Sequence, residues 1–128
     1  MIDTSVWIEF FRDANTPRVL QLEQSIRSGE AILGDLIFCE VLQGIRSDHD
    51  FKRVRNRLDA FPVVSIVGAE IAVQSAVNYR RLRRKGVRVR KIIDCLIATF
   101  CITHDLALLH NDRDFDPFEY ELNLKVIH

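Results

Sequence analysis

The sequence contains few cysteines, and their arrangement narrows the class of protein. Three are present, Cys39, Cys95 and Cys101, and no two of them form a CxxC pair. An odd number of cysteines without metal-ligand spacing argues against a structural zinc site. We therefore expect reduced cysteines, buried in the core of a cytosolic protein.

Long apolar runs, an excess of charge of one sign and repeats are also absent. The apolar runs are too short to cross a membrane, and no secretory leader pattern opens the chain. Lysine plus arginine and aspartate plus glutamate number 18 each, so only the distribution of charge can indicate a partner. Without repeats, low-complexity tracts or linkers, the 128 residues predict one cytoplasmic domain over 1–128.

The segment from Lys91 to Phe115 is the most informative stretch. Its first part places apolar residues at helical spacing around one acid, Asp94. An apolar run over 106–109 then suits a buried strand. Asp112 and Asp114 follow where that strand should end. Acids at a helix start and at a strand end occupy the positions where open α/β sheets place their chemistry.

Helices and short strands alternate along the remaining chain. Helices are expected over 6–11, from Pro17 to about 27, over 36–45, from a cap at Ser47 to about Ala60, and from Ala69 to about 85. Thr4 and Ser5 can cap the first helix, and the long helix should bury Ile71, Ala72, Ser75, Ala76, Tyr79 and Leu82.

Strands are expected at 1–3, 31–33, 62–66, 106–109 and 122–127, and the first of them should begin upstream of Met1. Strands separated by one or two helices predict an α/β fold. We expect an α/β/α sandwich in which a central, mostly parallel sheet of about five short strands has helices on both faces.

Four acidic positions stand at element ends or in apolar surroundings: Asp3, Glu40, Asp94, and Asp112 with Asp114 close behind. Parallel strands bring their carboxyl ends to one edge of a sheet, so we expect these acids to share a cleft. Several carboxylates repel one another unless a divalent cation lies between them. Oxygen ligands without histidine or cysteine favour Mg²⁺ or Mn²⁺. Such an ion can polarise a phosphodiester and generate hydroxide for in-line attack.

Each acid taken alone also has a simpler explanation. A lone aspartate near a helix start is commonly a cap or a dipole partner, and this is our interpretation of Asp35. Asp105 and Asp116 fit turns. Glu40 is the hardest to explain structurally, because it lies among apolar residues where an unpaired charge is costly. The cysteines and His110 are interpreted as structural.

Four segments, in order, resemble the signature motifs of PIN-domain proteins. They are Asp3–Ile8 (DTSVWI), Cys39–Gly44 (CEVLQG), Ile93–Ala98 (IDCLIA) and Leu109–Phe115 (LHNDRDF). More narrowly, they resemble VapC, the toxin of bacterial VapBC toxin–antitoxin modules. The resemblance covers essentially the whole chain and implies a Mg²⁺-dependent endoribonuclease with a compact α/β/α fold.

The resemblance also implies roles for individual residues. Asp3, Glu40, Asp94 and Asp112 match the acidic quartet, and the hydroxyl of Thr4 matches a position that assists the site. The last motif offers Asp114 as a second acid, so the fourth ligand is open. We expect Asp112 to face the metal. Asp114 should then cap a helix that begins near Phe115, or hold a metal-bound water.

Eight of the 18 lysines and arginines crowd into residues 80–91. This basic segment could be a solvated helix end, whose cations lie near the negative pole of the helix. Alternatively, it could bind RNA phosphates beside Asp94 through Arg84, Lys85, Arg88, Arg90 and Lys91. No aromatic residues interleave with the basic ones, so recognition would depend on backbone and shape more than on base sequence.

The expected partners follow from the resemblance. They are an RNA substrate, a VapB-type antitoxin and a second copy of the chain, in a heterotetramer or larger assembly with the antitoxin. Phe10, Phe11, Val19, Leu20 and Leu22 could line a groove for an antitoxin helix, although most of them suit the core equally well.

Two other functions are considered. A catalytically silent PIN-fold binding module would be marked by loss of an acid, yet all four positions are filled. A metal-dependent phosphatase-like hydrolase that forms a phosphoaspartate would need a second aspartate two residues after Asp3. Ser5 stands at that position.

Overall fold

The computed structural model describes residues 1–128 and divides into two compact units. Unit 1 comprises Met1–Val64 together with Leu109–Asn111, and unit 2 comprises Ser65–Leu108 together with Asp112–His128. The chain therefore returns to unit 1 for three residues before unit 2 is completed. The prediction of one domain over 1–128 stays a prediction.

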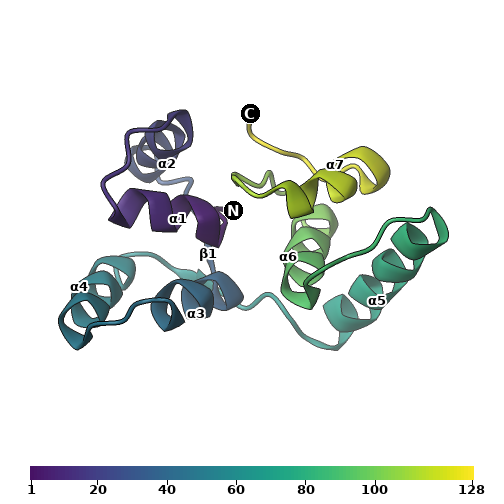
Figure 1. Ribbon diagram of the computed structural model, residues 1–128, viewed down its shortest axis with the longest axis horizontal. Helices are drawn as coiled ribbons and strands as arrows, with labels where there is room; N and C mark the ends of the chain where they lie inside the picture. Colours follow the sequence, from purple (N-terminus) through teal and green to yellow (C-terminus); the bar gives the residue numbers. More distant parts are fainter. The chain divides into compact units, whose positions relative to one another are not determined.

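Four helices form most of unit 1: α1 (Thr4–Phe11), α2 (Pro17–Arg27), α3 (Asp35–Gln43) and α4 (Asp48–Leu58) (Figure 1). The predicted starts at Pro17 and after Ser47 are confirmed, because Thr16 caps α2 and Ser47 caps α4. The predicted cap of α1 is wrong. The side chain of Asp3 caps this helix, because its carboxylate lies one residue before the helix and accepts a hydrogen bond from the Ser5 N–H.

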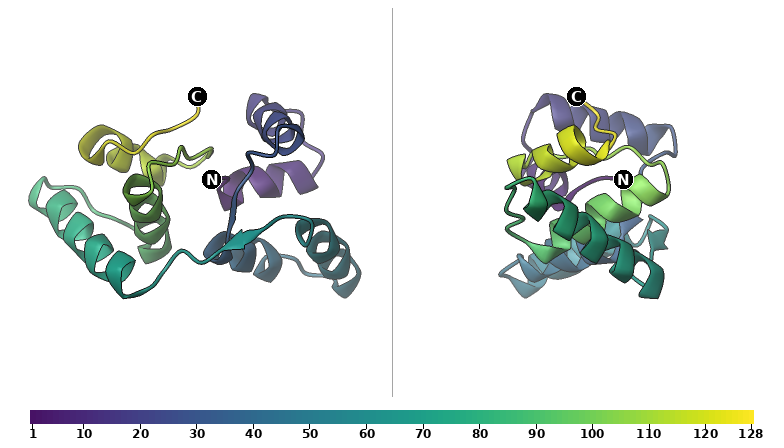
Figure 2. Two further views of the ribbon diagram at one scale, coloured as in Figure 1. Left: turned by 180° about the vertical axis from the view of Figure 1, so that it is seen from behind. Right: turned by 90° about the vertical axis from the view of Figure 1, so that its right-hand side faces the viewer.

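The strands of unit 1 are short and parallel. β1 (Leu33–Gly34) pairs with β2 (Val63–Val64), whose arrow is visible in the left view of Figure 2. Ile2 donates its N–H to the Ile32 carbonyl at 3.2 Å and forms a parallel bridge with Leu109. β1 cannot continue, because Gly34 is already the N-cap residue of α3.

Unit 2 contains α5 (Ala69–Arg84), α6 (Ile92–Thr103), the 3₁₀ turn η1 (Arg113–Phe115) and α7 (Asp116–Leu122) (Figure 1). Leu108 forms a parallel bridge with Val126. That bridge is all that is observed of the predicted strand over 122–127, because Leu122 ends α7 and Asn123 adopts a left-handed φ of 59°. The parallel arrangement is thus observed, whereas a sheet of five strands is not confirmed.

α5 packs against α6 through a seam that contains polar side chains. Ile71, Ser75, Asn78 and Leu82 are the buried residues of α5. The predicted inner positions Ala72, Ala76 and Tyr79 are exposed, so that part of the prediction is wrong. The buried side of α5 includes Asn78, which was not predicted there and whose Nδ2 donates to Thr99 Oγ1 at 3.1 Å; Ser75 Oγ donates to Cys95 Sγ at 3.2 Å. A buried polar residue of this kind is tolerated when it has a partner.

All three cysteines are free thiols. Cys95 and Cys101 are buried in α6, as predicted. Cys39 is exposed on α3, which corrects the prediction of a core position. None of the helices combines the length and the apolar character needed to cross a bilayer.

α6 offers a matched test of the core of unit 2. Ile97 is fully buried, whereas Ile92, in the same helix, is 75% exposed. We expect Ile97→Ala to lower the free energy of unfolding by about 2–5 kcal/mol, because it removes buried methyl groups and leaves a cavity. Ile92→Ala should change it by less than about 0.5 kcal/mol. Urea unfolding of both variants measures the difference, and equal midpoints would contradict this packing.

Candidate metal centre

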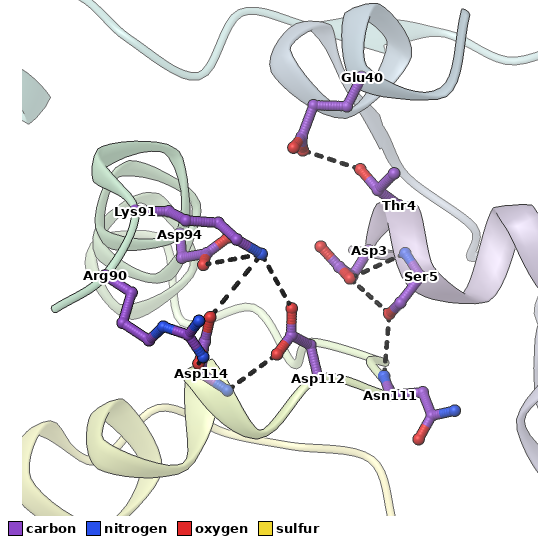
Figure 3. A network of polar contacts seen from close by, with 10 residues as sticks. All are labelled: Asp3, Thr4, Ser5, Glu40, Arg90, Lys91, Asp94, Asn111, Asp112 and Asp114. Atoms are coloured by element: carbon purple, nitrogen blue, oxygen red, sulfur yellow. Dashed lines mark hydrogen bonds and ion pairs between the residues drawn. The ribbon is translucent and has the colours of Figure 1, made fainter. Parts of the chain in front are cut away.

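The first acidic position, Asp3, is buried in unit 1 and held by its own helix start. Its Oδ2 accepts hydrogen bonds from the Ser5 N–H at 2.9 Å and from the Ser5 hydroxyl (Figure 3). The Ser5 hydroxyl oxygen in turn accepts from the Asn111 N–H at 3.0 Å. This arrangement fixes the direction of the carboxylate without a basic partner among these contacts.

Burial raises the pKa of Asp3 above its usual value, because desolvation penalises the charged form. The hydrogen bonds from Ser5 and Thr4, and the charge of His110, lower the pKa but do not offset burial. A carboxylate held ionised in such a place is a favourable ligand for a cation, since bound positive charge would relieve the cost.

Glu40 has a partner after all. The Thr4 hydroxyl donates to Glu40 Oε1 at 2.8 Å, which joins the start of α1 to α3 within unit 1 (Figure 3). The glutamate is half-buried on α3. Thr4 therefore aims the Glu40 carboxylate, which is consistent with the assisting role implied for this hydroxyl.

Sequence reasoning missed three supporting residues of unit 1. Ser5 and Asn111 form the chain of hydrogen bonds to Asp3. Glu9 accepts from the Thr16 hydroxyl at 2.6 Å and from the Asn111 side-chain amide. Only Ser5 left a usable signal, because a hydroxyl two residues after an aspartate at a helix start is a common local hydrogen-bonding pattern.

Unit 2 brings together Asp94, Asp112 and Asp114, whose carboxylates each offer an oxygen within 4.8 Å of the others. Asp94 is the third residue of α6 and is buried. Asp112 precedes η1, and its Oδ1 accepts from the Asp114 N–H at 2.9 Å (Figure 3). Three carboxylates this close repel one another and need compensating positive charge.

The predicted cap at Asp114 is wrong. Asp112 caps η1, whereas α7, the helix that follows, has no side-chain cap. The chain turns at Asp112 instead of continuing as a strand, and this turn brings both acids to the same cluster. The geometry of unit 2 thus favours both residues over either one alone.

Cations of the same unit contact the cluster. Lys91 Nζ lies 3.4 Å from Asp112, 3.7 Å from Asp114 and 3.9 Å from Asp94, and Arg90 lies 3.7 Å from Asp114. Partial burial acts to lower the pKa of Lys91, but the charges of the three carboxylates outweigh it and hold the pKa above its usual value.

Two of the predicted RNA-binding residues, Lys91 and Arg90, therefore contact acids instead of projecting only into solvent. The remaining cations of the basic segment lie on the surface. All eight side chains of the segment are exposed: Arg80, Arg81, Arg83, Arg84, Lys85, Arg88, Arg90 and Lys91. Lys85 pairs with Glu121 of α7.

The donor set fits a hard divalent cation. Asp94, Asp112 and Asp114 supply only oxygen atoms, and a side-chain ammonium already lies among them. Oxygen-only sets select Mg²⁺ or Mn²⁺ over zinc. In unit 1 the structure joins Thr4 to Glu40 and Ser5 to Asp3. That the acids of both units share one ion stays a prediction.

Comparison with known proteins gives the same family. A model of the PIN domain matches residues 1–119. The VapC ribonuclease Mb1587 of Mycobacterium bovis is 31% identical over 127 residues, which are 98% of this chain and 95% of that relative. Ribonuclease VapC11 of Mycobacterium tuberculosis matches with the same identity and coverage.

Solved structures agree in fold. VapBC2 from Rickettsia felis, bound to a DNA fragment from its promoter, matches with a TM-score of 0.79 and 17% identity, over 99% of this chain and 96% of that one. FitAcB from Neisseria gonorrhoeae matches with a TM-score of 0.78 and 18% identity, over 99% and 95%. At these identities the likeness establishes the fold alone.

The chain belongs to the PIN domain family. Its relatives at 31% identity over nearly the full length are VapC ribonucleases, which confirms the resemblance predicted from the four motifs.

The raised pKa of Asp3 generates a test in metal-free buffer. The pKa of this carboxyl is 3.8 in the unfolded chain and higher in the folded chain. At pH values above 3.8 the folded chain therefore keeps the proton that the unfolded chain has lost, and stability falls as pH rises through the folded pKa. Asp3→Asn keeps an acceptor for Ser5 but removes this charge. We therefore expect the variant to be more stable than wild type at pH 7, and the gain to vanish below about pH 3.8.

Thermal unfolding of both proteins between about pH 3.5 and 8, in the presence of chelator, measures this gain. Asp59→Asn, at an exposed acid of unit 1, is the control for loss of one negative charge. A gain for Asp3→Asn that is independent of pH would contradict the role of burial.

Proposed function

We propose that this protein is a metal-dependent endoribonuclease that acts as the toxin of a type II toxin–antitoxin module in the cytoplasm. The observation that supports it most directly is the oxygen-only cluster of Asp94, Asp112 and Asp114 in a chain whose relatives are VapC ribonucleases. A fold can host many activities, so the acids of the site, not the fold, support hydrolysis.

The acids have distinct tasks in this proposal. Asp94, Asp112 and Asp114 hold Mg²⁺ or Mn²⁺ in unit 2, and Asp3 and Glu40 are the acids of unit 1 with a proposed catalytic role. When bound, the ion polarises the phosphodiester and lowers the pKa of an attacking water. Ser5 directs Asp3 and Thr4 directs Glu40 through the hydrogen bonds described above. Asp112 fixes the start of η1 and so the position of Asp114.

RNA is held by the exposed basic segment. Arg84, Lys85 and Arg88 lie on and just after the last turn of α5, on the surface. Arginine and lysine neutralise backbone phosphates irrespective of sequence. Arg90 and Lys91, which contact the acids, stand where the phosphate backbone would meet the metal-binding cluster.

The antitoxin partner is proposed to use unit 1. A groove of about 610 Å³ is lined by residues of α1 and α2, the segment between them and Arg57 of α4. Its lining combines the apolar Phe10, Val19 and Leu20, of which Leu20 is 54% exposed, with charged residues such as Glu23. Val19 and Leu22 are buried in the core, so fewer of the five apolar residues named from the sequence are accessible to a partner. An amphipathic helix is the occupant that such a groove fits. A homodimer that assembles with antitoxin is part of the same proposal.

The alternatives receive less support. A silent binding module would not need three mutually repelling acids in one cluster, whose cost is recovered when they bind a cation. A phosphoaspartate hydrolase would need a second aspartate two residues after Asp3, and Ser5 stands at that position, where its N–H and hydroxyl both donate to Asp3 Oδ2.

Asp94→Asn tests the activity. We expect it to lower the rate of Mg²⁺-dependent RNA cleavage about a hundredfold or more, because it removes one charged ligand from the cluster. The matched control is Asp105→Asn, an exposed acid of the same unit that pairs with Lys125. When expressed without antitoxin, the wild type and the Asp105→Asn control should arrest growth, and Asp94→Asn should not. Co-expression of the antitoxin should relieve the arrest.

Cleavage by Asp94→Asn at the wild-type rate would refute the assignment. So would cleavage by all variants that survives complete removal of divalent ions, since the proposed chemistry requires one.

The basic segment is tested by Arg84→Ala combined with Arg88→Ala. Fewer counterions are released when fewer phosphates are neutralised, so the salt dependence of RNA binding should become shallower. The log–log slope should fall by about 0.7 for each phosphate that the variant no longer neutralises. The control replaces Arg53 and Arg55, two exposed cations of α4, with alanine. Equal slopes for the two double variants would show that residues 80–91 are a solvated surface.

A further inference from the structure

The position of the Lys91 ammonium among three carboxylates is not explained by the place of this residue in the sequence. Its ammonium lies within 4 Å of all three carboxylates of unit 2, at 3.4, 3.7 and 3.9 Å (Figure 3). One oxygen from each of these same carboxylates lies within 4.8 Å of those from the other two. The side-chain cation therefore lies within ion-pair distance of every acid of the cluster.

Lys91 is also the N-cap residue of α6, and its side chain makes no capping hydrogen bond. A cation is unfavourable at this end of a helix, which already bears partial positive charge. Side chains that accept hydrogen bonds are preferred there. The interaction that offsets this cost is the one with Asp94, Asp112 and Asp114.

The lysine is not enclosed by the protein. Its side chain is 55% exposed, whereas those of Asp94 and Asp114 are 7% and 18% exposed. A long flexible stem with one end in solvent can swing away from the cluster without disturbing the core. The backbone positions of the acids are set by α6 and by the capped η1 turn and do not depend on the lysine side chain.

We propose that Lys91 is a tethered counter-cation, which holds the three acids together in the metal-free protein and withdraws when a divalent ion binds. This inference rests on the proposed metal centre and adds that Lys91 competes with the metal ion for the three carboxylates. Lys91 lowers the affinity for metal, because its ion pairs with the carboxylates must be broken before the ion takes their place. It also stabilises the metal-free fold, because three acids would otherwise face one another.

The test is Mn²⁺ binding to the full chain by calorimetry, after removal of metal with chelator and dialysis. Lys91→Met removes the charge and keeps the length of the side chain. It should bind Mn²⁺ on the order of tenfold more tightly than wild type, as expected when a cation a few ångströms from several carboxylates is removed. Lys91→Arg should stay close to wild type. Lys85→Met removes an equal charge, which pairs with Glu121, and is the control for a general change in net charge.

Thermal unfolding in chelator gives a second measurement. The midpoint of Lys91→Met should fall below those of wild type and Lys85→Met, and Mn²⁺ should restore it. If Lys91→Met is unfolded without metal, recovery of its fold on addition of Mn²⁺ supports the proposal, and failure to recover overturns it.

Asp94→Asn separates the two proposals. If this variant loses Mn²⁺ binding while Lys91→Met binds no more tightly than wild type, the role of Lys91 is wrong and the metal centre stands. If neither wild type nor Lys91→Met binds Mn²⁺, or if Asp94→Asn binds it normally, the metal centre itself fails. Tighter binding by Lys85→Met equal to that of Lys91→Met would also overturn the inference.

Discussion

Repulsion among Asp94, Asp112 and Asp114 is the physical constraint that explains the charges placed around them in unit 2. Their oxygens lie within 4.8 Å of one another, so the folded chain must supply positive charge nearby. Lys91 and Arg90 provide it as whole charges, and the N-terminus of α6 provides a partial one for Asp94. In unit 1 the cost is the desolvation of the buried Asp3 carboxylate, which hydrogen bonds from Ser5 and Thr4 and the charge of His110 offset in part.

Two of the acids have a structural task as well as a proposed chemical one. Asp3 caps α1 and Asp112 caps η1, each through a hydrogen bond from a backbone N–H two residues later. A carboxylate that begins a helix has its direction fixed by the backbone, which is the rigidity that a ligand position requires. In Asp3 the cap uses Oδ2, and in Asp112 it uses Oδ1 while Oδ2 pairs with Lys91, so different atoms of the Asp112 side chain serve the fold and the acidic cluster.

Much of this arrangement could be predicted from the sequence, because it depends on local patterns. Helix spacing and caps located α2, α4 and α5 closely, and the four motifs located the acids and the family. The predictions were wrong where contacts between distant segments determine whether a side chain is buried. Asn78 is buried in α5, where its side chain donates to Thr99 of α6, and Cys39 lies on an exposed face of α3. The position of Lys91 could not be predicted, since its nearest acids, Asp112 and Asp114, lie more than twenty residues further along the chain.

The return of Leu109–Asn111 to unit 1 has a consequence for synthesis of the protein. Ile2 pairs with Leu109, and the Asn111 N–H donates to the Ser5 hydroxyl, so residues 1–64 lack part of their own unit until residues 109–111 have left the ribosome. A fragment ending after Val64 would expose the backbone groups that these late residues satisfy. Neither unit is therefore a contiguous piece that could be exchanged or produced alone, and a nascent chain stalled before residue 109 would hold Asp3 in an incomplete setting.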